Sequence, residues 1–153
     1  MQSLELKIPP PVVGVLVGLA MWAIASMSPG LDLPRPFRVT VAIALVLAGG
    51  AFSLAGAMSF RRAGTTVNPM KPETTRALVS TGIYRFTRNP MYIGLLLALI
   101  GWAVFLAAPW ALVGPLAFVL YIGRFQIAPE ERALSKRFGA DFDAYKAKVR
   151  RWL

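Results

Sequence analysis

Two short segments of the sequence combine residue types that could bind a small charged ligand. The first runs from Gly82 to Tyr92 and contains arginine, asparagine and tyrosine, and the second is Pro129–Glu131, with two adjacent carboxylates. Glutamate can accept hydrogen bonds from hydroxyl or ammonium groups, an arginine fork can hold a carboxylate, and tyrosine rings can lie against a cation. Together these groups suit a zwitterionic, aromatic ligand that has a cationic centre.

Each segment also has a purely structural interpretation. Arg88 can extend from a helix end to the membrane surface, Tyr84 and Tyr92 suit the membrane interface, and glutamates stabilise a helix N-terminus. However, Glu130 and Glu131 stand in a strongly basic stretch, where topology alone would favour Lys or Arg. The combination therefore favours a binding site.

The residues that are missing exclude several kinds of chemistry. The chain has no cysteine and no histidine. Disulfides, zinc–thiolate sites and cysteine nucleophiles are excluded, as are Ser-His-Asp triads and histidine-based metal sites. The Ala48-Gly49-Gly50 cluster lies in an apolar run with no acidic partner, so it is no dinucleotide loop. We expect no metal.

Composition points to the membrane. Of the 153 residues, 56% are hydrophobic and 16% are charged, and the formal net charge is +10. The mean hydropathy of +0.57 is too high for a soluble nucleic-acid binder or a disordered chain. We expect no nucleic-acid partner, but contact with anionic membrane lipids. The sequence predicts an all-α, polytopic membrane protein.

Long stretches without charge predict about four transmembrane helices, since one span needs about 20 apolar residues. The stretch between Arg88 and Arg124 is too long for one span, and Pro109 near its middle would break a helix. This stretch is therefore predicted to form a tight hairpin. The four predicted spans are Pro9–Met27, Val39–Phe60, Pro90–Ala107 and Trp110–Phe125. Glycines within them are predicted to permit close helix packing: Gly14, Gly18, Gly49, Gly50, Gly56 and Gly94.

The placement of Lys and Arg predicts the orientation. With four spans, every Lys and Arg except Arg35 and Arg38 falls on one side of the membrane. The positive-inside rule assigns that side to the cytoplasm, so both termini and both candidate segments are expected there, with Asp32–Arg38 on the far side.

The C-terminal segment is predicted to be helical and amphipathic. A new helix is expected to begin at Pro129, and Gly139 is expected to separate it from a second short helix. One apolar stripe recurs at helical spacing: Leu134, Phe138, Phe142, Tyr145, Val149 and Trp152. This stripe could pack onto the hairpin, or it could rest on the membrane surface as an interfacial helix.

At these residues the sequence resembles the integral-membrane methyltransferases that include isoprenylcysteine carboxyl methyltransferase and the phosphatidylethanolamine N-methyltransferases. The resemblance covers about Pro69–Trp152, in the family's order and with the hairpin between the two halves. The matching residues are Arg76-Ala77-Leu78-Val79, Gly82, Tyr84, Arg88-Asn89-Pro90-Met91-Tyr92, Glu130-Glu131, Leu134, Phe138-Gly139 and Tyr145. Asn89 replaces the usual histidine of the family, but it can still cap a helix and donate a hydrogen bond.

The resemblance implies S-adenosylmethionine as methyl donor, bound in a cytoplasm-facing pocket over the last two helices. The implied cofactor contacts are Arg76, Ala77, Leu78, Val79, Tyr84, Asn89, Pro90, Met91, Tyr92, Glu130 and Glu131. Arg88 and Glu130 are implied at the reacting centre, and Arg124 is the nearest match to a substrate-side arginine. On this interpretation, residues 1–60 are an N-terminal pair of transmembrane helices and residues 61–153 are the catalytic region.

The methyl acceptor is expected to be small, hydrophobic or lipid-like, because a chain of this size has little soluble surface with which to recognise a folded protein. Oxygen, nitrogen and sulfur acceptors remain open. Two other functions remain open as well: an NADPH-dependent membrane reductase of the sterol type, and a non-enzymatic, lipid-associated membrane protein. A homo-oligomer is compatible with each of these functions.

Overall fold

The structure is a computed structural model that describes residues 5–65 and 77–153. Within these ranges the regular structure is entirely helical, which confirms the all-α prediction. The elements in chain order are α1 (Pro10–Met27), α2 (Arg35–Arg62), η3 (Gly82–Arg85), α3 (Pro90–Leu106), η4 (Pro109–Leu112), α4 (Val113–Ile122), η5 (Gly123–Ile127), α5 (Ala128–Phe138) and α6 (Ala140–Lys148).

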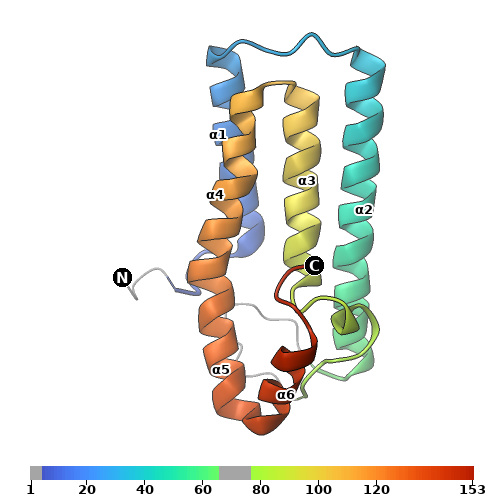
Figure 1. Cartoon of the computed structure of the whole chain (residues 1–153), viewed down its shortest axis with the longest axis vertical. Coiled ribbons are helices and arrows are strands. Elements are labelled where there is room, and N and C mark those ends of the chain that lie inside the picture. The colour runs from blue at the N-terminus through green and yellow to red at the C-terminus, as the bar shows by residue number, and fades with distance from the viewer. Residues whose placement is uncertain (1–4, 66–76) are drawn as a thin grey trace.

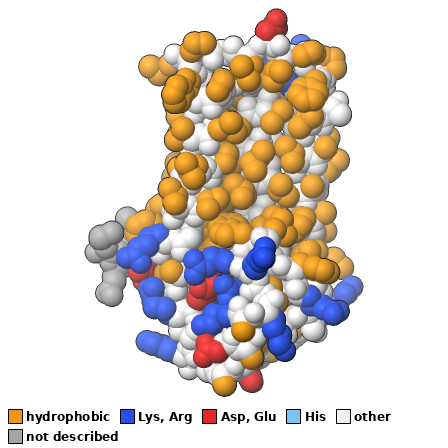
Figure 2. Space-filling model, viewed as in Figure 1, with side chains coloured by type: hydrophobic (Ala, Val, Ile, Leu, Met, Phe, Trp, Pro, Cys, Tyr) orange, Lys and Arg blue, Asp and Glu red, His pale blue; other side chains and the backbone are white. Residues whose placement is uncertain are grey.

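The long helices run side by side, and α5 continues below α4 (Figure 1). Three helical stretches are long and apolar enough to cross a membrane in the described part of the chain: α1, α2 and Pro109–Phe138. The fourth long helix, α3, is apolar but has 17 residues. The protein is therefore an integral membrane protein. Figure 2 shows hydrophobic side chains around the upper part of the bundle and charged ones gathered below.

Helix α5 begins at Ala128 and has Pro129, Glu130 and Glu131 in its first turn, as predicted, but it continues from α4 without the expected interruption. A π-helical turn, η5, joins α4 to α5 without a break. In this wider turn the Ala128 N–H donates to the Gly123 carbonyl, one residue further back than in an α-helix. The widened backbone accommodates the proline ring, which would otherwise clash with the preceding turn.

Helices α2 and α3 approach each other backbone to backbone. A Cβ at Gly94 would lie 2.5 Å from the Gly49 carbonyl oxygen and closer still to Ser53 Oγ. At Gly56, a Cβ would lie 3.0 Å from the Met91 side chain. The predicted role in close packing is confirmed for these three glycines. It is wrong for Gly50, because no atom lies within 4 Å of its Cβ position.

The two glycines of α1, Gly14 and Gly18, make looser contacts than those between α2 and α3. Cβ positions at Gly14 and Gly18 lie 3.8 and 3.9 Å from the side chains of Leu95 and Leu99, which is ordinary van der Waals distance. These glycines let α1 pack beside α3, and the Trp102 indole N–H donates to the Gly18 carbonyl at 3.0 Å.

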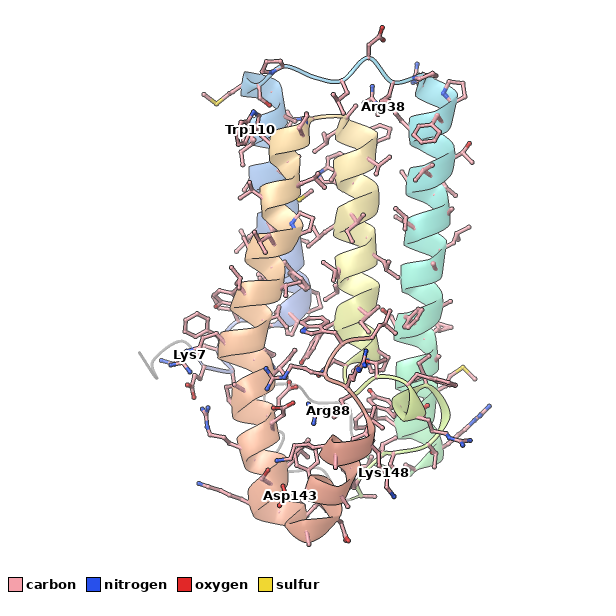
Figure 3. The ribbon with its side chains drawn as sticks, viewed as in Figure 1. Lys7, Arg38, Arg88, Trp110, Asp143 and Lys148 are labelled. Atoms are coloured by element: carbon pink, nitrogen blue, oxygen red, sulfur yellow. The ribbon has the colours of Figure 1, made fainter. Side chains whose placement is uncertain are left out.

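The C-terminal end of α3 contacts the connection between α1 and α2. Ala107 is in the left-handed conformation at φ 50°, and its carbonyl accepts the Leu31 N–H at 2.6 Å. The Arg38 guanidinium donates to the Phe105 carbonyl, and its carbon lies 5.6 Å from the centre of the Phe105 ring (Figure 3). A cation at the C-terminal end of a helix is favoured by the helix dipole.

Candidate functional site

The site lies where the start of α3 meets the start of α5. Helix α3 begins at Pro90, where the missing N–H of proline leaves no donor unsatisfied. The predicted side-chain cap by Asn89 is wrong, since α3 has no such bond. The Asn89 side chain instead donates to the Arg151 carbonyl at 2.8 Å, while its backbone N–H bonds Thr87 Oγ1 at 3.2 Å. Asn89 therefore ties the start of α3 to the C-terminal segment.

A buried carboxylate forms the centre of the site. Glu130 Oε1 accepts the Tyr92 hydroxyl at 2.5 Å and the Gln126 side-chain amide at 2.7 Å. Tyr92 is 6% exposed and Gln126 is 2% exposed. Sequence reasoning missed Gln126. The available signal was an amide in an apolar run, one helical turn before the glutamate, because residues four apart share a helix face.

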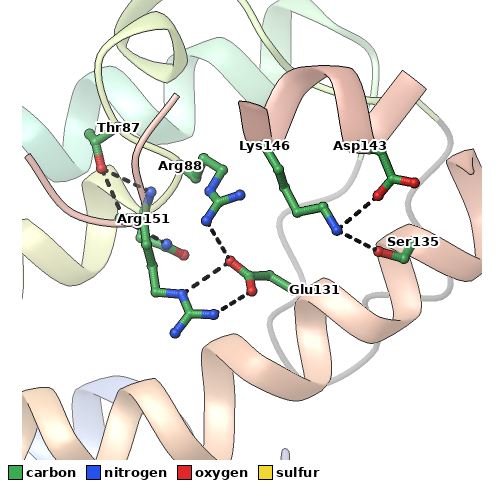
Figure 4. A network of polar contacts seen from close by, with 8 residues as sticks. Thr87, Arg88, Glu131, Ser135, Asp143, Lys146 and Arg151 are labelled. Carbon is green, nitrogen blue, oxygen red and sulfur yellow. Dashed lines mark hydrogen bonds and ion pairs between the residues drawn. The ribbon is translucent and has the colours of Figure 1, made fainter. Parts of the chain in front are cut away.

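The second carboxylate, Glu131, is held between two arginines (Figure 4). Its Oε1 lies 3.0 Å from Arg88 Nη2, and its Oε2 lies 2.5 Å from Arg151 Nη2. The side chains of Glu131 and Arg88 are 18% and 13% exposed. Two further nitrogens of Arg88, Nε and Nη1, are buried without a hydrogen-bond partner in the structure as described. Glu130 and Glu131 thus have different partners and different surroundings.

The C-terminal segment folds over the start of α3. The Arg88 N–H donates to the Arg150 carbonyl at 3.0 Å, and Thr87 Oγ1 donates to the Arg151 carbonyl at 3.3 Å. The Tyr145 hydroxyl donates to the Tyr84 carbonyl at 2.7 Å. Burial raises the pKa of Tyr145 to about 12, so this phenol keeps its proton at neutral pH. These bonds hold the C-terminal segment against η3 and the start of α3.

The predicted apolar stripe faces the protein interior. Phe142, Tyr145 and Val149 form a buried cluster, against which Leu78 packs together with stripe residues of α5. Trp152 packs against the main core between the long helices. The predicted break at Gly139 is confirmed, with φ at 50° between α5 and α6. Most of the stripe therefore packs against itself and Leu78, and Trp152 packs against the core to which the predicted hairpin helices α3 and α4 contribute.

The remaining candidate residues fall into three groups. Tyr84, Pro90 and Met91 lie close to Gly56 of α2, and the Tyr84 ring meets Phe60 edge to face at 5.3 Å. On the segment before η3, Val79 is buried, whereas Leu78 and Ala77 are partly buried. Arg124 is exposed on η5 and makes no hydrogen bond or ion pair with Glu130 or Arg88 in the described part of the chain. Arg76 lies outside the described residues.

A comparison with protein families covers most of this site. Residues 37–141 match the sequence profile of the phospholipid methyltransferase family. The chain belongs to this family. The match includes Arg88, Tyr92 and Glu130, whereas Arg150 and Arg151 lie beyond it. The matched residues thus contain the α3 and α5 side of the site, and the C-terminal residues that bond to the start of α3 lie outside them.

Individual relatives carry methyltransferase names as well. The chain is 31% identical to a probable protein-S-isoprenylcysteine O-methyltransferase of Oryza sativa subsp. indica over 112 residues, 71% of this chain and 57% of the relative. It is 35% identical to the protein-S-isoprenylcysteine O-methyltransferase of Saccharomyces cerevisiae over 82 residues, 52% of this chain and 33% of the relative. The chain thus spans about half or less of these two relatives.

A shorter relative lacks a functional name. An uncharacterized protein of Haemophilus influenzae is 48% identical over 63 residues, which is 41% of this chain and 100% of the relative. No solved structure matches the chain.

Proposed function

We propose that this membrane protein is an S-adenosylmethionine-dependent methyltransferase whose acceptor is a small hydrophobic or lipid-like molecule. One observation supports this most strongly: Arg88, which pairs with Glu131, has two buried nitrogens without a partner, and the next carboxylate along α5, Glu130, is held by Tyr92 and Gln126. Unpaired buried donors are costly unless a ligand satisfies them. A zwitterionic ligand brings a carboxylate for the arginine and donor groups for the glutamate.

The residues of the site fit this cofactor in chemical type. Arg88 Nε and Nη1 would hold the carboxylate of its amino-acid part. Glu130 would accept hydrogen bonds from its hydroxyl or ammonium groups, and the rings of Tyr84 and Tyr92 would lie near its cation. When bound, S-adenosylmethionine supplies a methyl group on a sulfonium centre. We extend the proposal to the other residues that the resemblance implies as cofactor contacts: Arg76, Ala77, Leu78, Val79, Asn89, Pro90, Met91 and Glu131.

The chain's own contribution to the reaction would be alignment and exclusion of water. In-line methyl transfer needs the two reacting atoms held in line, and it needs no protein nucleophile. A chain without histidine or cysteine can therefore catalyse it. The closed C-terminal segment would keep water out from below, and the exposed Arg124 at the α4–α5 junction would contact the acceptor. Residues 61–153 would then form the catalytic region, and residues 1–60 would be its membrane support.

Calorimetry of the detergent-solubilised protein tests the proposal. We expect S-adenosylmethionine and S-adenosylhomocysteine to bind and NADPH not to bind. Binding of NADPH alone would overturn the proposal in favour of a sterol-type membrane reductase. If none of the three binds, a non-enzymatic, lipid-associated role becomes the better explanation.

We further propose that α1, α2, α3 and α4 all cross the membrane, with α3 and α4 as a hairpin and the site at the cytoplasmic end. The charge distribution in Figure 2 supports this orientation. Because the chain has no cysteine, single cysteines can be labelled cleanly. We expect an impermeant maleimide added to spheroplasts to label Asp32→Cys but not Ala144→Cys, and to label both after lysis. Labelling of Ala144→Cys in sealed spheroplasts would contradict this topology.

A further inference from the structure

The N-terminal segment Glu5–Ile8, which we call the strap, is attached to the α4–α5 junction. The Leu6 N–H donates to the Phe125 carbonyl at 3.1 Å. Glu5 Oε2 lies 2.5 Å from Arg132 Nη2 on α5, and Ile8 packs against the main core. Leu6 has a φ of 56°, which is uncommon for a leucine, and these contacts hold it there. Figure 3 shows Lys7 of the strap beside this junction.

The strap supplies a donor that the helix itself lacks. In a regular α-helix the Phe125 carbonyl would accept from the backbone nitrogen of residue 129, but Pro129 has no N–H. Within the π-turn, the Ala128 N–H donates to the Gly123 carbonyl. The Leu6 N–H donates to the carbonyl that, in a regular α-helix, would accept from residue 129. The strap thus stabilises the unusual turn.

This turn carries the residue that orients the central carboxylate. Gln126 follows Phe125 directly, is 2% exposed and donates to Glu130 Oε1 at 2.7 Å. A π-turn changes the direction of the side chains on it relative to a regular helix, and such turns are frequent at functional sites. The direction of the Gln126 amide, and through it that of the Glu130 carboxylate, depends on the turn that the strap holds.

We propose that the strap is a positioning element for the ligand site: by holding the π-turn, it keeps Gln126 against Glu130. This inference rests on the proposed function for the identity of the ligand. The segment that completes the site would thus come from a part of the sequence that the family match, residues 37–141, does not include.

A charge exchange between Glu5 and Arg132 tests the proposal. The variants are Glu5→Arg, Arg132→Glu and the double exchange, and Asp143→Arg is the matched control. Asp143 makes a comparable ion pair with Lys146 at 2.9 Å on α6, away from the strap. For each protein, three quantities are measured: affinity for S-adenosylhomocysteine, the apo melting temperature, and hydrogen exchange of the peptide covering residues 123–131.

We expect each single reversal to weaken affinity about fivefold, the scale of one surface ion pair, and to speed exchange in residues 123–131. The melting temperature should fall by no more than about 4 °C, because an effect of about 1 kcal/mol shifts it by about 2–4 °C in a protein of this size. The double exchange should restore both affinity and exchange, and Asp143→Arg should change neither. Gln126→Leu should weaken affinity without faster exchange, since it leaves the turn intact.

Two results would overturn the proposal. One is unchanged exchange in residues 123–131 in both single reversals, because the strap would then not hold the turn. The other is a loss of affinity that the double exchange does not restore or that Asp143→Arg reproduces, which would indicate a general charge effect. If the unmodified protein bound no S-adenosylhomocysteine, the proposed function would fail, while the exchange measurements would still decide whether the strap holds the turn.

Discussion

Replacing Glu130 by glutamine is expected to weaken S-adenosylmethionine binding by about tenfold or more, with little change in the melting temperature of the apo protein. Charge-assisted hydrogen bonds contribute about 1.5–3 kcal/mol, and 1.4 kcal/mol corresponds to one decade of affinity. The glutamine oxygen can still accept from Tyr92 or Gln126, so the apo structure keeps a partner at this position. Calorimetry measures the affinity for S-adenosylmethionine, and thermal unfolding of the same samples measures the melting temperature.

Glu131→Gln is the matched control, because it makes the same chemical change at the neighbouring position. Glu131 pairs with Arg88 and Arg151, so its loss would leave a mostly buried guanidinium without its anion. We expect this variant to lower apo stability and loosen the C-terminal segment. If Glu130→Gln lowered apo stability as much and left binding intact, Glu130 would be a structural residue and the proposed site would lose its central group.

Gly94→Leu is expected to destabilise the protein by about 3 kcal/mol or more, at the upper end of the effects of overpacking. The new side chain would have to pass through Ser53 and the Gly49 backbone, and backbone atoms cannot move aside as a flexible side chain can. Reversible unfolding of the purified protein in mixed micelles measures the effect. The yield of correctly inserted protein gives a second measure in case the variant does not assemble.

Gly50→Leu provides the control for this substitution. Gly50 is the adjacent residue to Gly49 on the same helix, but its Cβ position has no atom within 4 Å. The same added volume should therefore be tolerated there. Because leucine favours a helix more than glycine does, helix propensity cannot explain a loss in either variant. Equal destabilisation by Gly94→Leu and Gly50→Leu would mean that the added side-chain volume itself, rather than the close α2–α3 contact, explains the loss.

Several features of this molecule could be predicted from sequence because they depend on local patterns. Charge-free stretches locate α1 and α2, and Asn89-Pro90 marks the start of α3 because proline favours the first helical turn. The apolar stripe after Pro129 follows from helical spacing, and Gly139 marks its break. In each case a few neighbouring residues contain the whole signal.

The features that were missed depend on residues far apart in the chain. Pro129 is normally a reason to end a helix, but here a π-turn joins α4 to α5 without a break, and the distant Leu6 N–H donates to the Phe125 carbonyl of that turn. Asn89 was expected to cap its own helix, but a carbonyl 62 residues away competes successfully for its side chain. Local patterns contain no information about such distant donors and acceptors, so the pairing of Glu131 with Arg151 could not be deduced from them. Gln126 is different, because it lies one helical turn before Glu130 and could have been found from that spacing.

The carbonyls of Arg150 and Arg151 that bond the start of α3 have a consequence for the order of biosynthesis. These two residues leave the ribosome after every helix of the bundle has been made. The bond between Arg151 and Asn89 closes a loop of 62 residues. Closing such a long loop has an entropic cost that local helix formation does not have, so this bond forms after the helices. The helices can thus be inserted and packed while the proposed ligand site is still open, and on that proposal a newly made molecule would become competent to bind only when the segment around Arg150 and Arg151 has folded back.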